Sequence, residues 1–257
     1  MLIENQIIQG DCTKVLPQLP RESIDLVVTD PPYGVRYTDR YGRTVANDDD
    51  LTPVLDAFGQ VYRVLKQNSF CISFYGWNRV DEFFRAWRAA GFCPVGHLVW
   101  RKSYGSSRSF LEARHEQAYL LAKGRPAKPA KPISDVRDWE YSGNKAHPTQ
   151  KSPSILRPLI EAFSWPNDLV LDPFSGSGST SVAAKQAGRR FLGIELEPHY
   201  CEFARMSLGL QPAGEGGQVE RFTGALADFT AWMKEQGIAL PADFEARAQR
   251  EWSLPSQ

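Results

Sequence analysis

The chain has 257 residues, of which 42% are hydrophobic, and its 30 basic residues balance its 30 acidic ones. That length allows one α/β domain with additions, or at most two small domains, and the apolar content excludes global disorder. No apolar run approaches the ~18 residues of a membrane helix, and the start, MLIENQIIQGDC, lacks the pattern of a signal peptide. Because Cys12, Cys71, Cys93 and Cys201 show no metal-ligand spacing, we expect reduced thiols in a cytoplasmic protein that does not enter a membrane.

Short apolar or β-branched runs alternate with helix-like segments along the chain. The predicted strands are residues 24–29, 69–74, 96–101, 116–122, 168–172 and 190–195, with a further short one at 6–9. The predicted helices are residues 51–66, 80–91, 152–164, 177–188 and 198–210. This alternation predicts an α/β protein with a mostly parallel sheet that helices cover on both faces. Ligands of such sheets bind beyond the carboxyl ends of the strands.

Three stretches interrupt this pattern. Residues 35–50 are polar and follow a proline pair, and residues 212–218 read as a linker. Residues 124–146 begin with three prolines in nine positions, so they form neither a central strand nor a helix. The segment after the linker predicts one or two helices of unassigned purpose.

The zero net charge conceals one basic interval. Between Arg101 and Lys151 there are 11 lysines and arginines against 5 acids, a balance of +6, so the remainder of the chain carries −6. A single basic face on a neutral body is one way for a protein to bind a polyanion. A solvated loop that is rich in lysine is the alternative.

The stretch TDPPYG, residues 29–34, ends the predicted strand 24–29. Proline fixes φ and has no N–H group, so Pro31 and Pro32 make the turn rigid. Asp30 offers carboxylate oxygens, the carbonyl group of Pro31 can point into a cleft, and Tyr33 supplies a flat ring. Two acceptors and a stacking ring suit a planar base that bears an exocyclic amino group and has left its duplex. A rigid loop with a capping aspartate is the alternative.

A second motif, VLDPFSGSGST, reads as a strand that ends in Asp172, a glycine-rich turn and a helix start. Gly176 and Gly178 allow the backbone to approach a ligand closely. The motif lacks the GK[ST] of a triphosphate-binding loop and does not fit GxGxxG. Glu195 ends the next predicted strand, where an acid can hold both hydroxyl groups of a ribose. The pair predicts an adenosine-type cofactor, against the alternative of a capping turn and a surface glutamate.

Together the two motifs resemble the S-adenosylmethionine-dependent DNA amino-methyltransferases, which modify N6 of adenine or N4 of cytosine. In that family DPPY is the catalytic motif and the DPFSGSGST-like loop binds the cofactor. Here the catalytic motif comes first, an order that is similar to the beta group of the family. Further segments resemble the family at residues 10–12 (GDC), 97–102 (HLVWRK), 115–124 (HEQAYLLAKG) and 147–160 (HPTQKSPSILRPLI).

The resemblance covers residues 5–210. It implies a Rossmann-like methyltransferase fold with a catalytic domain over residues 1–210. A target-recognition segment would span about residues 103–146 of that domain, and residues 211–257 would form a C-terminal helical extension.

The resemblance also implies which residues hold S-adenosylmethionine. Asp11 would accept from the cofactor's adenine amino group with the backbone of Cys12 nearby, and Thr149 and Lys151 would hold the methionine end. The full predicted set is Asp11, Cys12, Thr149, Lys151, Asp172, Phe174, Ser175, Gly176, Gly178, Thr180 and Glu195. The family's proline directly after the lysine is replaced by Ser152 here. We therefore expect a slightly shifted helix start with function retained.

The chemistry that the resemblance implies needs no covalent enzyme intermediate, because the sulfonium methyl group is already activated. The protein's work is positioning. The predicted catalytic residues are Asp30, Pro31, Pro32 and Tyr33, and Asp30 accepts the positive charge that develops on nitrogen. Nothing in the chain predicts metal chemistry. No cysteine follows a proline, as the nucleophile for cytosine C5 usually does, so that branch is rejected.

Asp30 favours adenine N6, because the family's cytosine-N4 enzymes carry serine at that position, although the acceptor geometry serves both amino groups. We therefore expect a site-specific DNA adenine-N6 methyltransferase, with cytosine N4 as the alternative. Enzymes that methylate protein glutamine or ribosomal RNA guanine carry NPPY, but their cofactor loop precedes it. A non-enzymatic nucleic-acid-binding relative is disfavoured by the intact Asp30, Tyr33, Asp172 and Glu195.

The expected partner is double-stranded DNA, and the basic interval is its expected binding region. The predicted phosphate contacts are Arg101, Lys102, Arg108 and Arg114. A proline-spaced loop that would follow a groove of the DNA carries Lys123, Arg125, Lys128 and Lys131, and the DNA role of the 35–50 loop is limited to Arg36, Arg40 and Arg43. Trp139 and Tyr141 either fill the gap left by a flipped base or pack in the core. The sequence leaves the target site, a restriction partner, and the choice between monomer and homodimer open.

Overall fold

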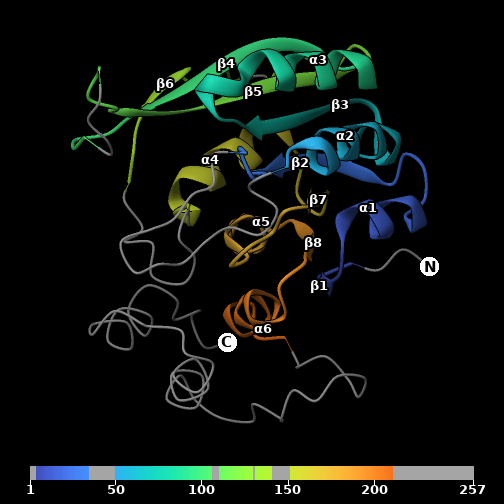
Figure 1. Ribbon diagram of the computed structural model, residues 1–257. Helices are drawn as coiled ribbons and strands as arrows, with labels where there is room; N and C mark the ends of the chain where they lie inside the picture. Colours follow the sequence, from blue (N-terminus) through green and yellow to red (C-terminus); the bar gives the residue numbers. More distant parts are fainter. Residues whose placement is uncertain (1–3, 35–49, 106–109, 130, 141–150, 211–257) are drawn as a thin grey trace.

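The computed structural model describes residues 4–34, 50–105, 110–129, 131–140 and 151–210. In these parts of the chain the strands form a single eight-stranded sheet in the order β1-β8-β7-β2-β3-β5-β4-β6. The strands are β1 (Gln6–Gln9), β2 (Ile24–Thr29), β3 (Leu65–Phe74), β4 (Cys93–Arg101), β5 (His115–Lys123), β6 (Val136–Asp138), β7 (Leu169–Asp172) and β8 (Arg190–Glu195). Figure 1 shows them descending from β4, β5 and β6 at the top to β1 at the bottom.

All strands except β5 run in one direction. The pairs from β1 through β8, β7 and β2 to β3 are parallel. The β5 strand is antiparallel to both β3 and β4, and β4 pairs in parallel with β6. The mostly parallel sheet predicted from the sequence is thus confirmed, and its carboxyl ends form one edge.

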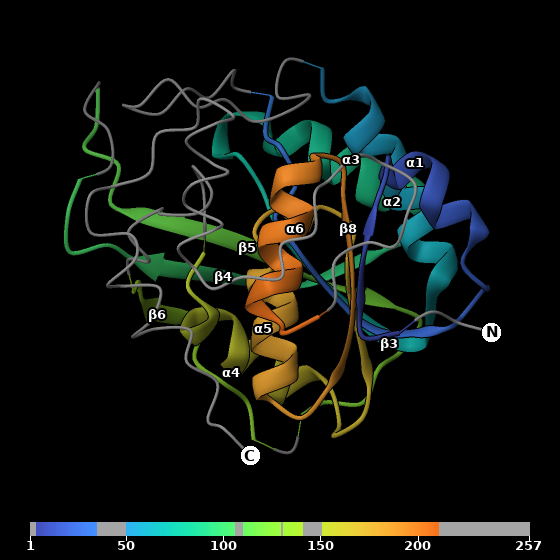
Figure 2. The ribbon, with the colours of Figure 1, turned by 90° about the horizontal axis from the view of Figure 1, so that it is seen from below.

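Helices cover both faces of the sheet. They are α1 (Cys12–Val15), α2 (Thr52–Val64), α3 (Val80–Ala90), α4 (Pro153–Phe163), α5 (Ser179–Gln186) and α6 (Pro198–Ser207), with short 3₁₀ turns at Leu16–Gln18 and Trp77–Arg79. Figure 2 shows α5 and α6 on one side of β8 and α1 and α2 on the other. Within the described residues, none of the helices has the length and apolar character needed to cross a membrane.

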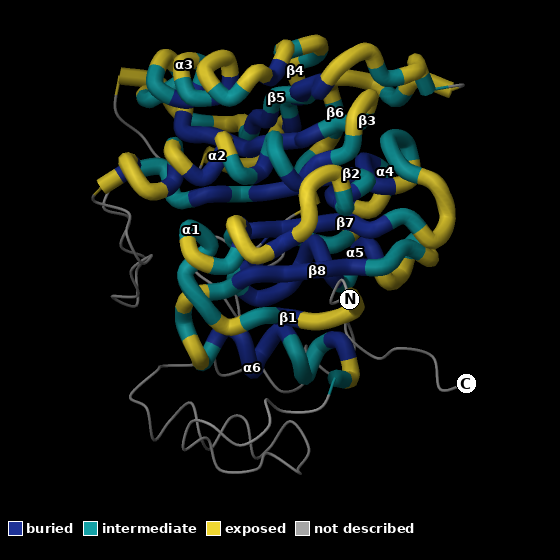
Figure 3. The backbone as a smooth tube through the Cα atoms, turned by 90° about the vertical axis from the view of Figure 1, so that its right-hand side faces the viewer, coloured by how far each residue is buried: buried dark blue, intermediate teal, exposed yellow. Residues whose placement is uncertain are grey.

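The alternation of side chains in β2 explains why the run IDLVVT is so apolar. Val27 joins the core cluster that contains Phe58 of α2 and Trp87 of α3. Leu26 and Val28 point the other way and join the cluster built with α4, α5 and α6. A strand that helices cover on both sides buries every side chain, so its sequence does not alternate between apolar and polar residues. In Figure 3 the strands β2, β7 and β8 form the buried centre of the molecule.

The chain changes direction across the sheet between β2 and β7. From β2 it continues through α2 to β3 on one side, whereas from β7 it continues through α5 to β8 on the other. Such a reversal leaves a crevice at the carboxyl ends of the two strands, and ligands of open α/β sheets bind there.

Most element positions agree with the sequence prediction, and the departures are local. The β3 strand begins at Leu65, immediately after α2, four residues before the predicted start. The short helix α1 and the edge strand β6 were not predicted. Helix α4 begins at Pro153 with Ser152 as its N-cap, so the serine that replaces the family's proline has a structural role. The predicted C-terminal extension lies outside the described residues.

Candidate active site

Four acids stand in a row at the carboxyl edge of the sheet. Asp11 follows β1, Glu195 ends β8, Asp172 ends β7 and Asp30 follows β2. These strands are neighbours in the order β1-β8-β7-β2. With neighbouring strands about 4.8 Å apart, the row spans roughly 14 Å. The fold therefore gathers acids that are up to 184 positions apart in the sequence into one track.

Asp30 holds two hydrogen bonds, one on each carboxylate oxygen. The Tyr33 hydroxyl group donates to Oδ1 at 2.5 Å. The ammonium group of Lys151 donates to Oδ2 and forms an ion pair with it. The predicted catalytic aspartate and tyrosine thus contact each other, and Pro31 and Pro32 make the turn between them rigid.

Lys151 lies just before α4, and its side chain is only 7% exposed. Its ammonium group is 4.4 Å from the centre of the Phe74 ring, which ends β3. A buried cation needs an anionic partner, and Asp30 supplies it here. Lys151 was predicted to hold the cofactor, and the structure adds a direct contact with the predicted catalytic aspartate.

Asp172 joins the two central strands. Its Oδ1 accepts from the buried hydroxyl group of Thr29 at 2.9 Å and from the backbone N–H of Phe174 at 3.1 Å. Burial raises the pKa of Asp172 to about 6, against the opposing effect of hydrogen bonds from Thr180, Phe174 and Thr29. The carboxylate therefore fixes the start of the glycine-rich turn relative to β2.

Glu195 holds the glycine-rich turn from the neighbouring strand. Its Oε2 accepts from the backbone N–H of Gly176 at 2.7 Å, and its Oε1 accepts from that of Glu197 at 2.8 Å. Burial raises the pKa of Glu195 to about 7. Such a carboxyl group gains from any further hydrogen-bond donor, because donors stabilise its ionised form.

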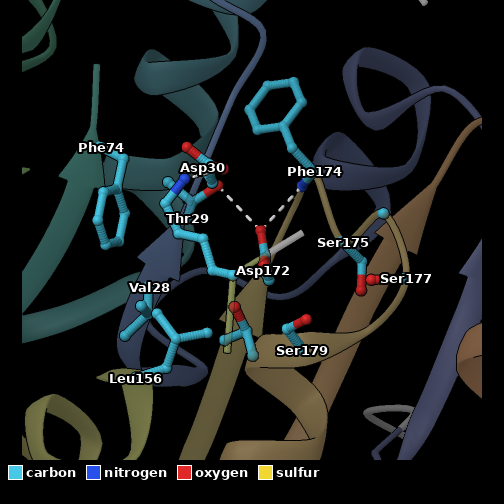
Figure 4. Close-up of a pocket in the computed structure, with 13 residues that line it drawn as sticks. Val28, Thr29, Asp30, Phe74, Leu156, Asp172, Phe174, Ser175, Ser177 and Ser179 are labelled. Carbon is cyan, nitrogen blue, oxygen red and sulfur yellow. Dashed lines mark hydrogen bonds and ion pairs between the residues drawn. The ribbon is translucent and has the colours of Figure 1, made fainter. Parts of the chain in front are cut away.

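The pocket between these groups has free hydrogen-bonding capacity. Its lining comprises Val28, Thr29, Asp30, Phe74, Lys151, Leu156, Asp172, Phe174, Ser175, Gly176, Ser177, Ser179 and Thr180 (Figure 4). The hydroxyl groups of Ser175 and Ser179 are buried and have no hydrogen-bond partner in the described part of the chain. Buried polar groups are nearly always hydrogen-bonded, so these two fit a polar ligand in the pocket.

Gly178 shows why the turn needs glycine. It has φ +82°, in the left-handed region, and a Cβ atom there would lie 2.7 Å from Cβ of Ala204 in α6. Both the conformation and the close approach to α6 exclude a side chain. Beside it, Gly176 also has a positive φ of 50°. The turn can thus face a ligand with backbone atoms alone.

Asp11 completes the track at its far end. Its Oδ1 caps α1 by accepting from the backbone N–H of Thr13 at 2.9 Å, and hydrogen bonds from Thr13 lower its pKa. The backbone N–H of Gly10 donates to the carbonyl group of Glu195 at 2.8 Å, so the β1 end is tied to β8. Burial raises the pKa of the Cys12 thiol to about 12, which keeps it a neutral thiol. Thr149, the remaining predicted cofactor residue, lies outside the described residues.

Two of the lysines predicted to contact DNA, Lys102 and Lys123, are buried in the structure, which speaks against that role. Lys102 pairs with Glu116 and has a side chain only 6% exposed. Lys123 donates to the backbone carbonyl groups of Tyr62 and Leu65 at 2.8 and 2.6 Å. Since β5 runs against the other strands, Lys123 also lies at the opposite edge of the sheet from Asp30.

Two other predicted contacts remain exposed near the carboxyl edge. Arg101 ends β4 and forms an exposed ion pair with Asp138, and Arg114 donates to the carbonyl group of Ser103. Exposed pairs of this kind are weak and exchange readily for a phosphate. Lys128 is exposed in the segment that leads from β5 to β6. Arg108, Tyr141 and the three arginines of the 35–50 loop lie outside the described residues.

Trp139 is half-buried, which favours the packing role over the role of filling the gap left by a flipped base. It packs against the cluster formed with α4, α5 and α6, and the ammonium group of Lys102 lies 5.6 Å from its ring centre. Exposed apolar side chains near the carboxyl edge include Trp77, Phe110 and Leu111, which are 73%, 102% and 83% exposed. The sequence did not predict their exposure, because the spacing of these apolar residues along the chain does not show which of them face solvent.

The pocket also contains residues to which the sequence motifs assigned no role. Phe74 ends β3, Leu156 belongs to α4, and Thr29 is the last residue of β2. One signal was available for Phe74 and Thr29, since both end predicted strands and so lie at the carboxyl edge. Leu156 had none beyond its place in an apolar helix face.

Comparisons with known proteins identify the family of this chain. The family model described as "DNA methylase" matches residues 24–206. The protein YubD of Escherichia coli (strain K12), which is named as a methylase, is 54% identical over 76% of this chain and 86% of its own. The type II methyltransferase M.HinfI of Haemophilus influenzae is 30% identical over 79% of this chain and 68% of its own.

Solved structures share the fold. The M1.HpyAVI–SAM complex superimposes with a TM-score of 0.64 at 24% identity, covering 80% of this chain and 99% of that one. The PvuII DNA methyltransferase, described as cytosine-N4-specific, has a TM-score of 0.66 at 17% identity and covers 91% and 93%. The predicted Rossmann-like methyltransferase fold is thereby confirmed.

We predict that Gly178→Ala destabilises the protein by about 2–4 kcal/mol, because strain at positive φ adds to overpacking against Ala204. Gly188→Ala is the matched control, since Gly188 has φ +69° but nothing within 4 Å of a Cβ atom. It should cost only the strain, about 1 kcal/mol. Urea unfolding of both variants measures the difference, and equal losses would contradict the close packing of the turn against α6.

Proposed function

This chain belongs to the DNA methylase family, and we propose that it transfers a methyl group from S-adenosylmethionine to N6 of adenine in double-stranded DNA. The observation that carries the proposal is the position of Asp30 and Tyr33 beside the glycine-rich turn at the switch point of the sheet. Methyl transfer to an amino group needs an acceptor for N–H next to a cofactor pocket, and these residues supply both. The choice of adenine over cytosine rests on the aspartate of DPPY.

S-adenosylmethionine is the cofactor, and when bound it supplies an electrophilic methyl group. The roughly 14 Å track of acids suits an extended ligand that crosses four strand ends. Asp11 would bind the adenine amino group and Glu195 the ribose hydroxyl groups. Ser175 and Ser179 offer unused hydroxyl groups between them and Asp30. Lys151 would bind the negatively charged end of the methionine portion.

Asp30 would accept one N–H of the target amino group, and the carbonyl group of Pro31 the other. These contacts turn the nitrogen lone pair out of conjugation with the ring and towards the methyl group. The carboxylate also stabilises the positive charge that develops on nitrogen. Tyr33 holds Oδ1 of Asp30 in place through its 2.5 Å hydrogen bond. The residues orient the reactants, and proximity lowers the barrier.

DNA would lie along the carboxyl edge of the sheet. Arg101 and Arg114 are exposed there, at the two ends of the β4–β5 connection. They would contact phosphates and position the duplex without reading its sequence. The contact between Lys128 and DNA stays a prediction. The location in the cytoplasm and the target-recognition segment stay predictions too, and the choice between monomer and homodimer stays open.

We predict that incubation with methyl-labelled S-adenosylmethionine and unmethylated bacterial genomic DNA labels deoxyadenosine. Mass spectrometry of the digested nucleosides identifies the product. Asp30→Ala should remove all label while S-adenosylhomocysteine still binds, because the acceptor of the amino group is lost and the cofactor pocket is not. Label on deoxycytidine would assign cytosine N4 instead. Label retained by the Asp30→Ala variant would refute the role of Asp30.

We expect cofactor affinity to fall in acid. The pKa of Glu195 is about 7, and its carboxylate is the form that accepts hydrogen bonds from ribose hydroxyl groups. Affinity should therefore be constant above pH 8 and decrease by up to about tenfold per pH unit below 7. Calorimetry with 5′-methylthioadenosine isolates this effect, because that ligand has the ribose but no amino acid. Glu195→Gln should bind weakly at all these pH values, and a flat wild-type profile would contradict the assignment.

The Arg101→Ala/Arg114→Ala double variant should weaken DNA binding and flatten its salt dependence. Each lost phosphate contact lowers the slope of log K against log salt by about 0.9. Lys66→Met is the control, since Lys66 pairs with Asp25 away from the carboxyl edge. Fluorescence anisotropy with a labelled duplex at several salt concentrations measures the slopes. A slope equal to that of wild type would exclude these arginines from the DNA face.

A further inference from the structure

Both oxygens of the predicted catalytic carboxylate accept a hydrogen bond from the protein itself. Tyr33 donates to Oδ1 of Asp30 and Lys151 donates to Oδ2. An exocyclic amino group must use one of these oxygens to donate its N–H. The hydroxyl group of Tyr33 is tethered three residues from Asp30, so it stays. Each carboxylate oxygen can accept two hydrogen bonds, so Lys151 leaves room at Oδ2, but its positive charge beside that oxygen opposes the positive charge that develops on the target nitrogen.

The surroundings of Lys151 favour an exchange of anionic partners. Its side chain is 7% exposed and lies over the ring of Phe74. Asp172, the other acid in the pocket, uses Oδ1 for Thr29 and Phe174 and carries a raised pKa. Asp30 is therefore the carboxylate with which Lys151 pairs in the pocket. A new carboxylate entering the pocket would compete with Asp30 for the ammonium group.

We propose that Lys151 is a gate on the amino-group acceptor: it occupies Asp30 until the carboxylate of the cofactor's methionine end draws it away. The inference rests on the proposed function, because it needs a cofactor that carries a carboxylate. It adds an order to binding, in which the cofactor enters first and thereby removes the opposing charge from Oδ2 before the target base binds. Lys151 is in this sense a positioning residue, since it acts through Asp30.

The gate has a consequence that is measurable without DNA or turnover. If binding of the cofactor must break the Lys151–Asp30 pair, then the free energy needed to separate the pair lowers the affinity of the protein for the cofactor. Asp30→Asn removes the competing charge while it retains the shape of the side chain. S-adenosylhomocysteine should then bind about threefold to thirtyfold more tightly, the range expected for coupling between contacting charged groups. 5′-Methylthioadenosine, which has no carboxylate, should bind both proteins equally.

A double-mutant cycle separates the gate from simple repulsion between Asp30 and the ligand's carboxylate. Lys151→Met should bind S-adenosylhomocysteine more weakly than wild type. If Lys151 is the gate, adding Asp30→Asn to Lys151→Met should leave the affinity for S-adenosylhomocysteine unchanged, because no ammonium group remains to be released. If Asp30→Asn raises the affinity in the Lys151→Met protein as much as in wild type, the gain comes from lost repulsion between Asp30 and the ligand's carboxylate, and the proposal is overturned.

Lys66→Met is the matched control. Like Asp30→Asn it removes one charge of a lysine–aspartate pair, here that of Lys66 with Asp25 away from the carboxyl edge; it leaves the bond from Leu169 to Asp25 in place and should leave binding of both ligands unchanged. Titration calorimetry gives the affinities, and thermal melting verifies that each variant is folded. Should Lys151→Met not fold, Lys151→Gln takes its place in the cycle, because glutamine keeps a polar side chain and removes the charge.

Two results would overturn the gate when the two ligands are compared on the Asp30→Asn variant. Unchanged or weaker binding of S-adenosylhomocysteine to Asp30→Asn would mean that Lys151 bridges both carboxylates or does not contact the ligand. A similar gain for 5′-methylthioadenosine would mean a general effect on the pocket. Failure of wild type to bind S-adenosylhomocysteine would reject the cofactor and the gate together. If the double-mutant cycle gives the expected affinities but no labelled nucleoside is found in the DNA, only the DNA substrate is rejected.

Discussion

The contact between β2 and β7 is the constraint on which the site depends. Carboxylates tie the two strands together at both ends: Asp25 accepts from the backbone N–H of Leu169 at one edge, and Asp172 accepts from Thr29 at the other. The second bond joins residues 143 positions apart. It fixes the DPPY turn relative to the glycine-rich turn, so the acceptor and the cofactor pocket have a defined separation. Positioning chemistry needs that rigidity, since small displacements cost large factors in rate.

Burial of acids at this edge has an energetic cost that a ligand relieves. Asp172 and Glu195 both carry raised pKa values because the sheet and its loops remove water from them. The pocket is therefore rich in acceptors and short of donors. A ligand with amino and hydroxyl groups supplies the missing donors, and the buried hydroxyl groups of Ser175 and Ser179 gain partners as well. The same electrostatic need pairs Lys151 with Asp30.

The sequence predicted those parts of the structure that depend on neighbouring residues alone. The run IDLVVT and the segment RFLGIE match β2 and β8 at every residue, and the glycine-rich turn lies where the motif indicated. What sequence could not predict depends on distant partners. Lys102 and Lys123 look like surface cations, yet Glu116 and the carbonyl groups after α2 bury them. The three-residue strand β6 exists only because the end of β4 offers it an edge.

The pairing of β1 with β8 joins the two ends of the domain and sets when it can fold. Asn5 accepts from the backbone N–H of Phe191, 186 positions later. At a synthesis rate of about 5–20 residues per second, the first strand waits roughly 10–40 s for its neighbour to be made. During that interval β2 also lacks β7, which leaves its apolar run without a partner on that side. Unpaired apolar strands are prone to aggregate during synthesis, and contacts this distant predict slow folding.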